Sequence, residues 1–112
     1  KVYTTVVVES PFDARRTDVW AALLTLIADS STDEFAEALS IEPPWRYVYS
    51  RSDVEAALCE CSVTIRDDGE TCNVAWAALI DPLPDGGSSA FVDSVRPLFE
   101  GHLETLRSRL RS

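Results

Sequence analysis

His102 is the only histidine among the 112 residues and is the clearest candidate for acid–base chemistry. An imidazole changes charge near neutral pH, and a carboxylate that orients the ring makes it an effective general base. Glu9 or Glu55 could supply that carboxylate, although nothing in the sequence fixes the pairing. The plainer interpretation is a histidine at the rim of a site, in the C-terminal half of a helix, where a cation is mildly favoured. We therefore expect His102 to border a binding site, and we assign no catalytic residue.

The three cysteines, Cys59, Cys61 and Cys72, indicate buried strand positions more than a metal centre. Cys59 and Cys61 are separated by one residue, so a strand points both thiols to one face, whereas structural zinc sites use wider spacings and four ligands. A cysteine in apolar strand sequence behaves as a small buried hydrophobe. We expect three reduced thiols, no metal or other cofactor, and a reducing, cytoplasmic compartment.

Large rings are the other candidates for a site. Rings line pockets for flat apolar ligands, and tyrosine hydroxyls orient such ligands. The same rings could simply fill the core of a short chain, and both interpretations stay open. The candidate ligand-binding residues are Trp20, Tyr47, Tyr49, Trp76, Phe99 and His102.

The length and the net charge of the chain restrict the functions to which these residues can contribute. A chain of 112 residues has room for one domain with one core, which we place at residues 1–112. The formal net charge of −9 argues against nucleic acid and against an anionic membrane surface, because both attract basic proteins. No apolar run approaches the roughly 20 residues that span a bilayer, so we expect no membrane insertion.

Hydrophobic periodicity predicts the elements that must position these side chains. The segment from Val2 to Glu9 reads as a first strand, and a helix with an apolar face through Trp20 follows it. A second, short helix is expected at Phe35, Ala36 and Leu39, because Ser30 to Thr32 can start it and Pro43 and Pro44 end it. Three alternating segments then predict antiparallel strands: Trp45 to Arg51, Val54 to Arg66, and Glu70 to Asp81. Asp67-Asp68-Gly69 is a strong hairpin signal between the last two strands.

The last quarter of the chain, Ser88 to Ser112, predicts one long amphipathic helix. Pro97 inside it indicates either a kink or a break. A stripe this long needs a broad partner, and a helix laid across a curved sheet tends to leave a cavity that binds ligands. Apolar residues at spacings of three and four form the stripe: Val92, Val95, Phe99, Leu103, Leu106 and Leu110.

Several local sequences together carry a family resemblance. They are Val6-Val7-Val8-Glu9-Ser10-Pro11, Asp18-Val19-Trp20-Ala21-Ala22-Leu23, Cys61-Ser62-Val63-Thr64-Ile65, Val74-Ala75-Trp76 and the closing Leu103, Leu106 and Leu110. These sequences resemble the START-like superfamily, which includes the birch-pollen allergens and the polyketide cyclases. The resemblance implies an α+β fold in which an antiparallel sheet grips a long C-terminal helix, known as the helix-grip fold, here with a reduced number of strands.

The resemblance also implies a function. It favours a small non-catalytic domain that holds a hydrophobic small molecule or lipid between the sheet and the C-terminal helix. Two alternatives stay open: a polyketide cyclase or aromatase-like enzyme, and a protein-interaction module of the heat-shock ATPase activator type. A shortened sheet leaves an unpaired edge, so we expect a homodimer that buries this edge or the aromatic face from Trp45 to Tyr49.

Overall fold

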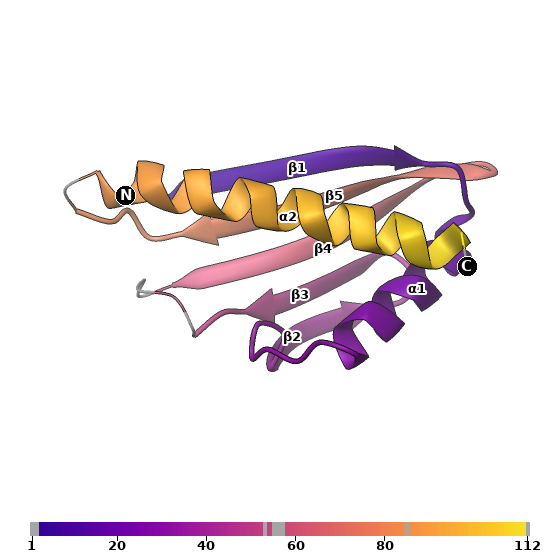
Figure 1. Cartoon of the computed structure of the whole chain (residues 1–112), viewed down its shortest axis with the longest axis horizontal. Helices are drawn as coiled ribbons and strands as arrows, with labels where there is room; N and C mark the ends of the chain where they lie inside the picture. Colours follow the sequence, from indigo (N-terminus) through magenta and orange to yellow (C-terminus); the bar gives the residue numbers. More distant parts are fainter. Residues whose placement is uncertain (1–2, 53, 55–57, 85, 112) are drawn as a thin grey trace.

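The computed structural model describes residues 3–52, 54, 58–84 and 86–111, and within them the chain folds as a sheet covered on one face by helices (Figure 1). This arrangement confirms the expected α+β fold, in which an antiparallel sheet grips a long C-terminal helix. The elements are β1 (Thr4–Phe12), α1 (Arg16–Ala28), β2 (Glu37–Glu42), β3 (Arg46–Ser50), β4 (Cys59–Asp68), β5 (Thr71–Ile80) and α2 (Gly87–Arg111).

The described strands form one antiparallel sheet in the order β1-β5-β4-β3-β2. The first strand, β1, lies beside the last strand, β5, and forms one edge of the sheet, whereas β2 forms the other edge. The β4–β5 hairpin closes where Asp68 pairs with Thr71. Gly69 turns the chain there with a φ of 85°, a conformation that glycine adopts without strain.

The inner face of the sheet follows the predicted alternation on β4 and β5. A strand points successive side chains to opposite faces, and here every second side chain is buried. The strand expected from Val54 begins only at Cys59, and residues 55–57 lie outside the described residues. The buried side chains are Cys59, Cys61, Val63 and Ile65 on β4, and Cys72, Val74, Trp76, Ala78 and Ile80 on β5.

The short second helix predicted at Phe35, Ala36 and Leu39 is wrong. Phe35 lies in a turn and Leu39 lies in β2, so four described strands follow α1 where three were expected. The Thr32 amide donates to Ser30 Oγ and the Glu34 amide donates to Thr32 Oγ1. Such side-chain acceptors compete with helical hydrogen bonding and favour a turn.

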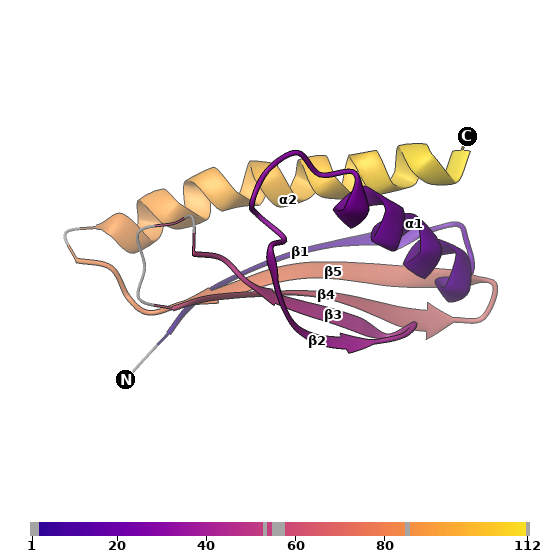
Figure 2. The ribbon, with the colours of Figure 1, turned by 90° about the horizontal axis from the view of Figure 1, so that it is seen from below.

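The long helix α2 runs diagonally across the inner face of the sheet, and α1 packs beside its C-terminal half (Figures 1 and 2). Val95, Phe99, Leu103 and Leu106 are buried, which confirms most of the predicted stripe; Val92 and Leu110 are partly buried. The helix continues through Pro97, an exposed residue on its solvent side, where water can satisfy the carbonyl that proline leaves without a donor.

None of the helices within the described ranges has the length and apolar character needed to cross a membrane.

Candidate functional site

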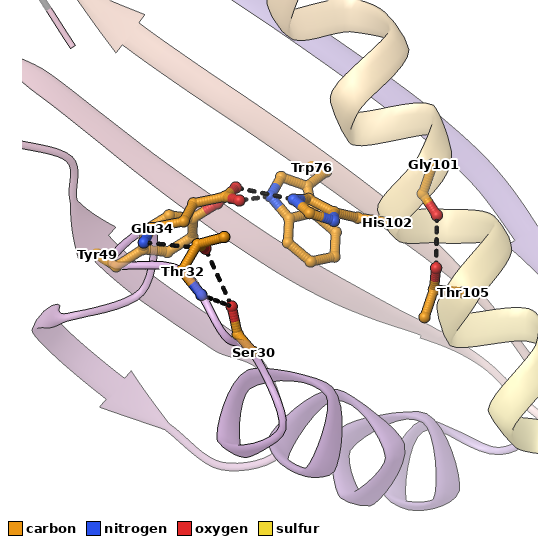
Figure 3. A network of polar contacts seen from close by, with 8 residues as sticks. All are labelled: Ser30, Thr32, Glu34, Tyr49, Trp76, Gly101, His102 and Thr105. Carbon is orange, nitrogen blue, oxygen red and sulfur yellow. Dashed lines mark hydrogen bonds and ion pairs between the residues drawn. The ribbon is translucent and has the colours of Figure 1, made fainter. Parts of the chain in front are cut away.

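Five rings meet between the inner face of the sheet and α2, and we call them the aromatic cluster: Phe35, Tyr49, Trp76, Phe99 and His102. Figure 3 draws Tyr49, Trp76 and His102 of this cluster. The Trp76 and His102 ring centroids are 4.8 Å apart, and Phe35 meets Tyr49 edge-on at 5.0 Å. Phe35 also lies 5.6 Å from His102. Three elements and one loop therefore supply a single aromatic surface.

The remaining predicted site residues extend this cluster along β3 to α1. The Tyr47 ring lies 6.2 Å from Tyr49 and 6.4 Å from Trp20, by centroid. All six candidate residues thus belong to one continuous set of rings. Trp45, expected on the same face as Tyr47 and Tyr49, does not join them: it lies in the turn before β3, 53% exposed, with the Arg16 guanidinium 3.5 Å from its ring centroid.

The space at the centre of the cluster is filled by side chains. Tyr49, Trp76 and Phe99 each have no solvent exposure. Phe35 reaches them from residues 30–36, the segment that arches from the end of α1 toward α2 before β2 begins (Figure 2). The protein's own ring therefore occupies the place where the sequence suggested a cavity.

A carboxylate–imidazole pair lies inside this aromatic surrounding. His102 Nε2 is 2.8 Å from Glu34 Oε2, and the two side chains are only 16% and 8% exposed. Among the described residues, Glu34 is the only buried one with a charged side chain. Burying a carboxylate is costly unless it is paired, and His102 supplies the partner.

One of the carboxylates that the sequence suggested for His102, Glu9, was wrong. Glu9 is exposed and accepts a hydrogen bond from Asn73 Nδ2 at 3.0 Å. It alternates with the buried Val6 along β1 and so points away from α2. Glu55 lies outside the described residues. Glu34 was missed because its segment was assigned to a helix, although the run Ser30-Ser31-Thr32-Asp33 is itself typical of a turn.

Tyr49 brings a neutral hydroxyl into the cluster. Trp76 Nε1 donates a hydrogen bond to Tyr49 Oη at 2.8 Å. Burial raises the pKa of Tyr49 well above its usual value, and the negative charges that Cys61 and Glu34 can carry raise it further. The hydroxyl therefore remains protonated at physiological pH and can orient a bound polar group.

The three thiols are buried and free of disulfides. A hydrogen bond with Cys59, followed by burial, raises the pKa of Cys61, and burial raises the pKa of Cys72. A protonated thiol is a poor nucleophile and a poor metal ligand. The part of the chain that the structure describes contains no group of three or more His, Cys, Asp or Glu side chains that could hold a metal ion.

No protein-family model matches this chain, and no curated protein matches its sequence. Solved structures do match its fold. CalU16 from Micromonospora echinospora superposes with a TM-score of 0.70 at 14% identity, over 95% of this chain and 75% of CalU16. An AHSA1-like protein from Rhizobium etli gives 0.68 at 12% identity, over 97% and 82%.

The di-domain ARO/CYC StfQ of the steffimycin biosynthetic pathway gives a TM-score of 0.76 at 7% identity. The match covers 98% of this chain and 52% of StfQ, so the chain spans about half of that protein. At these identities the likeness concerns the fold alone. It confirms that the chain adopts the START-like helix-grip fold that its sequence predicted.

Proposed function

We propose that this helix-grip domain is a non-catalytic binding protein for a flat hydrophobic small molecule, held between the inner face of the sheet and α2. The observation that carries the proposal is the Glu34–His102 pair inside the aromatic cluster. A hydrophobic core gains little from a buried ion pair, because desolvation offsets the attraction. Ligand sites, by contrast, combine apolar rings with a few convergent polar groups.

Each part of the cluster has a role in this proposal. Trp76 and Phe99 offer ring faces from β5 and α2, at a centroid distance of 6.0 Å. The Tyr49 hydroxyl and the His102 imidazole offer hydrogen bonds at known positions. Phe35 now covers these groups, so a ligand would enter by displacing it. The fold gives general support, since StfQ, an ARO/CYC of a biosynthetic pathway, has the same architecture.

The test is a titration with naphthalene, a flat neutral probe, followed by heteronuclear NMR of the indole N–H groups. We expect a saturable shift of the Trp76 signal, because a ring bound in the cluster shields it. Trp45 is an internal control, since it is exposed and lies outside the cluster. Phe35→Ala should tighten binding by making room, whereas Leu39→Ala, at an exposed position on β2, should not. Equal shifts of both indoles, or none, would contradict the proposal.

One observation favours the enzymatic alternative, a polyketide cyclase-like activity. The Glu34–His102 pair has the composition of a carboxylate-oriented general base, and Tyr49 lies in the same cluster. Native mass spectrometry of the protein loaded with ligands from its own host separates the two functions. If the mass of the bound ligand is the same before and after incubation with the protein, binding is supported. If that mass decreases by the mass of water, a cyclase is supported.

We also propose that the protein forms a homodimer and works in the cytoplasm. All six residues of β2 are exposed, including Leu39 and Ile41, so this edge is available for pairing. The other expected surface is unsuitable, because Tyr47 and Tyr49 are buried within the chain. The buried free thiols fit a reducing compartment.

Glu37 and Glu42 at the ends of β2, together with the net charge of −9, oppose the approach of a second copy. Salt screens such repulsion, so the dimer fraction should rise with ionic strength. Light scattering over a range of protein and salt concentrations measures it. A monomer mass throughout would show that the edge stays unpaired.

A further inference from the structure

Glu34 and Phe35 are the only buried residues of segment 30–36; Ser30 is half-buried and the others are exposed. The two are adjacent in the chain, and both side chains enter the space between the sheet and α2. Phe35 contributes a phenyl ring to the aromatic cluster. Glu34 contributes a carboxylate to His102 (Figure 3). Together they place one aromatic ring and one carboxylate in the proposed binding site.

Among the residues that the structure describes, few other contacts hold the segment in place. Its backbone hydrogen bonds are local, with the Ser30 amide donating to Ile27 O at 3.2 Å and the Ala36 amide donating to Asp33 O at 3.1 Å. Its hydroxyl contacts, between Ser30 and Thr32, are also internal. A segment with few buried contacts and local hydrogen bonds opens at low free-energy cost. Its attachment to the rest of the fold therefore depends mainly on Glu34 and Phe35.

From this arrangement we infer that Glu34 and Phe35 imitate the ligand, and that the ligand is a small aromatic carboxylic acid. This inference rests on the proposed function and specifies its ligand class. In the bound state the ligand's ring replaces Phe35 against Tyr49, Trp76 and His102. Its carboxylate replaces that of Glu34 at His102 Nε2, and segment 30–36 moves away from α2.

Electrostatics explain why the ligand should be an acid. His102 Nε2 faces a carboxylate at 2.8 Å, and the rings of Phe35, Trp76 and Phe99 lie around the imidazole. An incoming carboxylate keeps this pairing intact and returns Glu34 to water. A neutral ligand that displaced Glu34 would leave the imidazole without its partner. A buried hydrogen-bonding group without a partner destabilises the complex by its full desolvation penalty.

The experiment compares cinnamate with cinnamyl alcohol, which share a ring and chain but differ in charge. Wild-type protein should bind cinnamate about tenfold or more tightly than the alcohol, the size expected for one charge-assisted hydrogen bond. His102→Gln should remove this preference while still binding the alcohol. Glu34→Gln should tighten cinnamate binding, because it weakens the internal competitor. Asp33→Asn, an exposed carboxylate in the same segment, is the matched control and should change nothing.

Hydrogen exchange on the wild-type protein gives a second readout that needs no variant. Saturating cinnamate should speed exchange of the Ala36 amide, whose hydrogen bond to Asp33 holds the turn, and should leave the amides of β4 slow. Slower exchange at Ala36 would mean that the segment stays in place, which overturns the inference.

The outcomes distinguish the inference from the proposed function. If naphthalene shifts Trp76 but cinnamate and cinnamyl alcohol bind equally, the proposed function stands and the acid-specific inference fails. If naphthalene, cinnamate and cinnamyl alcohol all fail to bind both the wild type and Phe35→Ala, both are overturned.

Discussion

Replacing Tyr49 with Phe tests how much the interior of this protein depends on a single buried hydrogen bond. Tyr49 and Trp76 have no solvent exposure, and Trp76 Nε1 donates to Tyr49 Oη at 2.8 Å. Tyr49→Phe keeps the ring and removes the acceptor. The indole N–H then remains buried among rings, where water cannot reach it.

The size of the effect follows from that isolated donor. Leaving a buried hydrogen-bonding group unsatisfied costs about 1–3 kcal/mol, so we expect Tyr49→Phe to destabilise the fold by about 2 kcal/mol. For a domain of this size the melting temperature falls by about 4 °C for each kcal/mol, which gives a decrease of about 8 °C. The loss should be smaller in a Trp76→Phe background, because the donor is then already absent.

Urea unfolding followed by circular dichroism measures these free energies without depending on tryptophan fluorescence. Tyr47→Phe is the matched control, since its hydroxyl makes no hydrogen bond to any residue the structure describes, and it should cost less than about 0.5 kcal/mol. A stability of Tyr49→Phe equal to that of the control would refute the reasoning. So would an equal loss in the Trp76→Phe background.

Three further predictions concern the helix, the pH dependence and the thiols. Leu106→Asp places a charge at a fully buried position of α2 and should cost more than about 4 kcal/mol, measured by thermal unfolding, whereas the exposed Ser108→Asp should be nearly neutral. The folded state raises the pKa values of Tyr49, Cys61 and Cys72, so the unfolded chain releases these protons first. Stability should therefore fall as pH rises above about 9, where unfolded thiols ionise, and Cys61→Ala should flatten that slope in urea titrations at several pH values. Elemental analysis of the purified protein should find no stoichiometric zinc; one zinc per chain would contradict our interpretation of the cysteines.

The sequence predicts the elements of this fold in which buried side chains recur at a regular spacing. Alternation at Cys59, Cys61 and Trp76 identifies the inner face of β4 and β5, and the three-and-four spacing of Phe99 and Leu106 identifies the buried face of α2. Both patterns exist because one face of each element is buried. Of these elements, β5 carries Trp76, and α2 carries Phe99 and His102.

The features that the sequence does not predict have no such regular spacing of buried side chains. The strand β2 is exposed at all six positions, so it has no buried face, and Leu39 was assigned to the expected second helix instead. The Glu34–His102 contact joins residues 68 positions apart, and no local pattern specifies a pair that distant. Phe35 is a single apolar residue in a polar turn, and only the tertiary fold shows which surface it meets.

In the binding mode that we propose, Glu34 and Phe35 compete with the ligand at a concentration that dilution cannot change, because segment 30–36 is part of the chain. Such a tethered competitor lowers the affinity, because the intrinsic dissociation constant is divided by the fraction of molecules in which the segment is open. It also limits the kinetics. A ligand that can bind only after the segment has opened will associate no faster than the opening itself, so its observed association rate should reach a plateau at high ligand concentration.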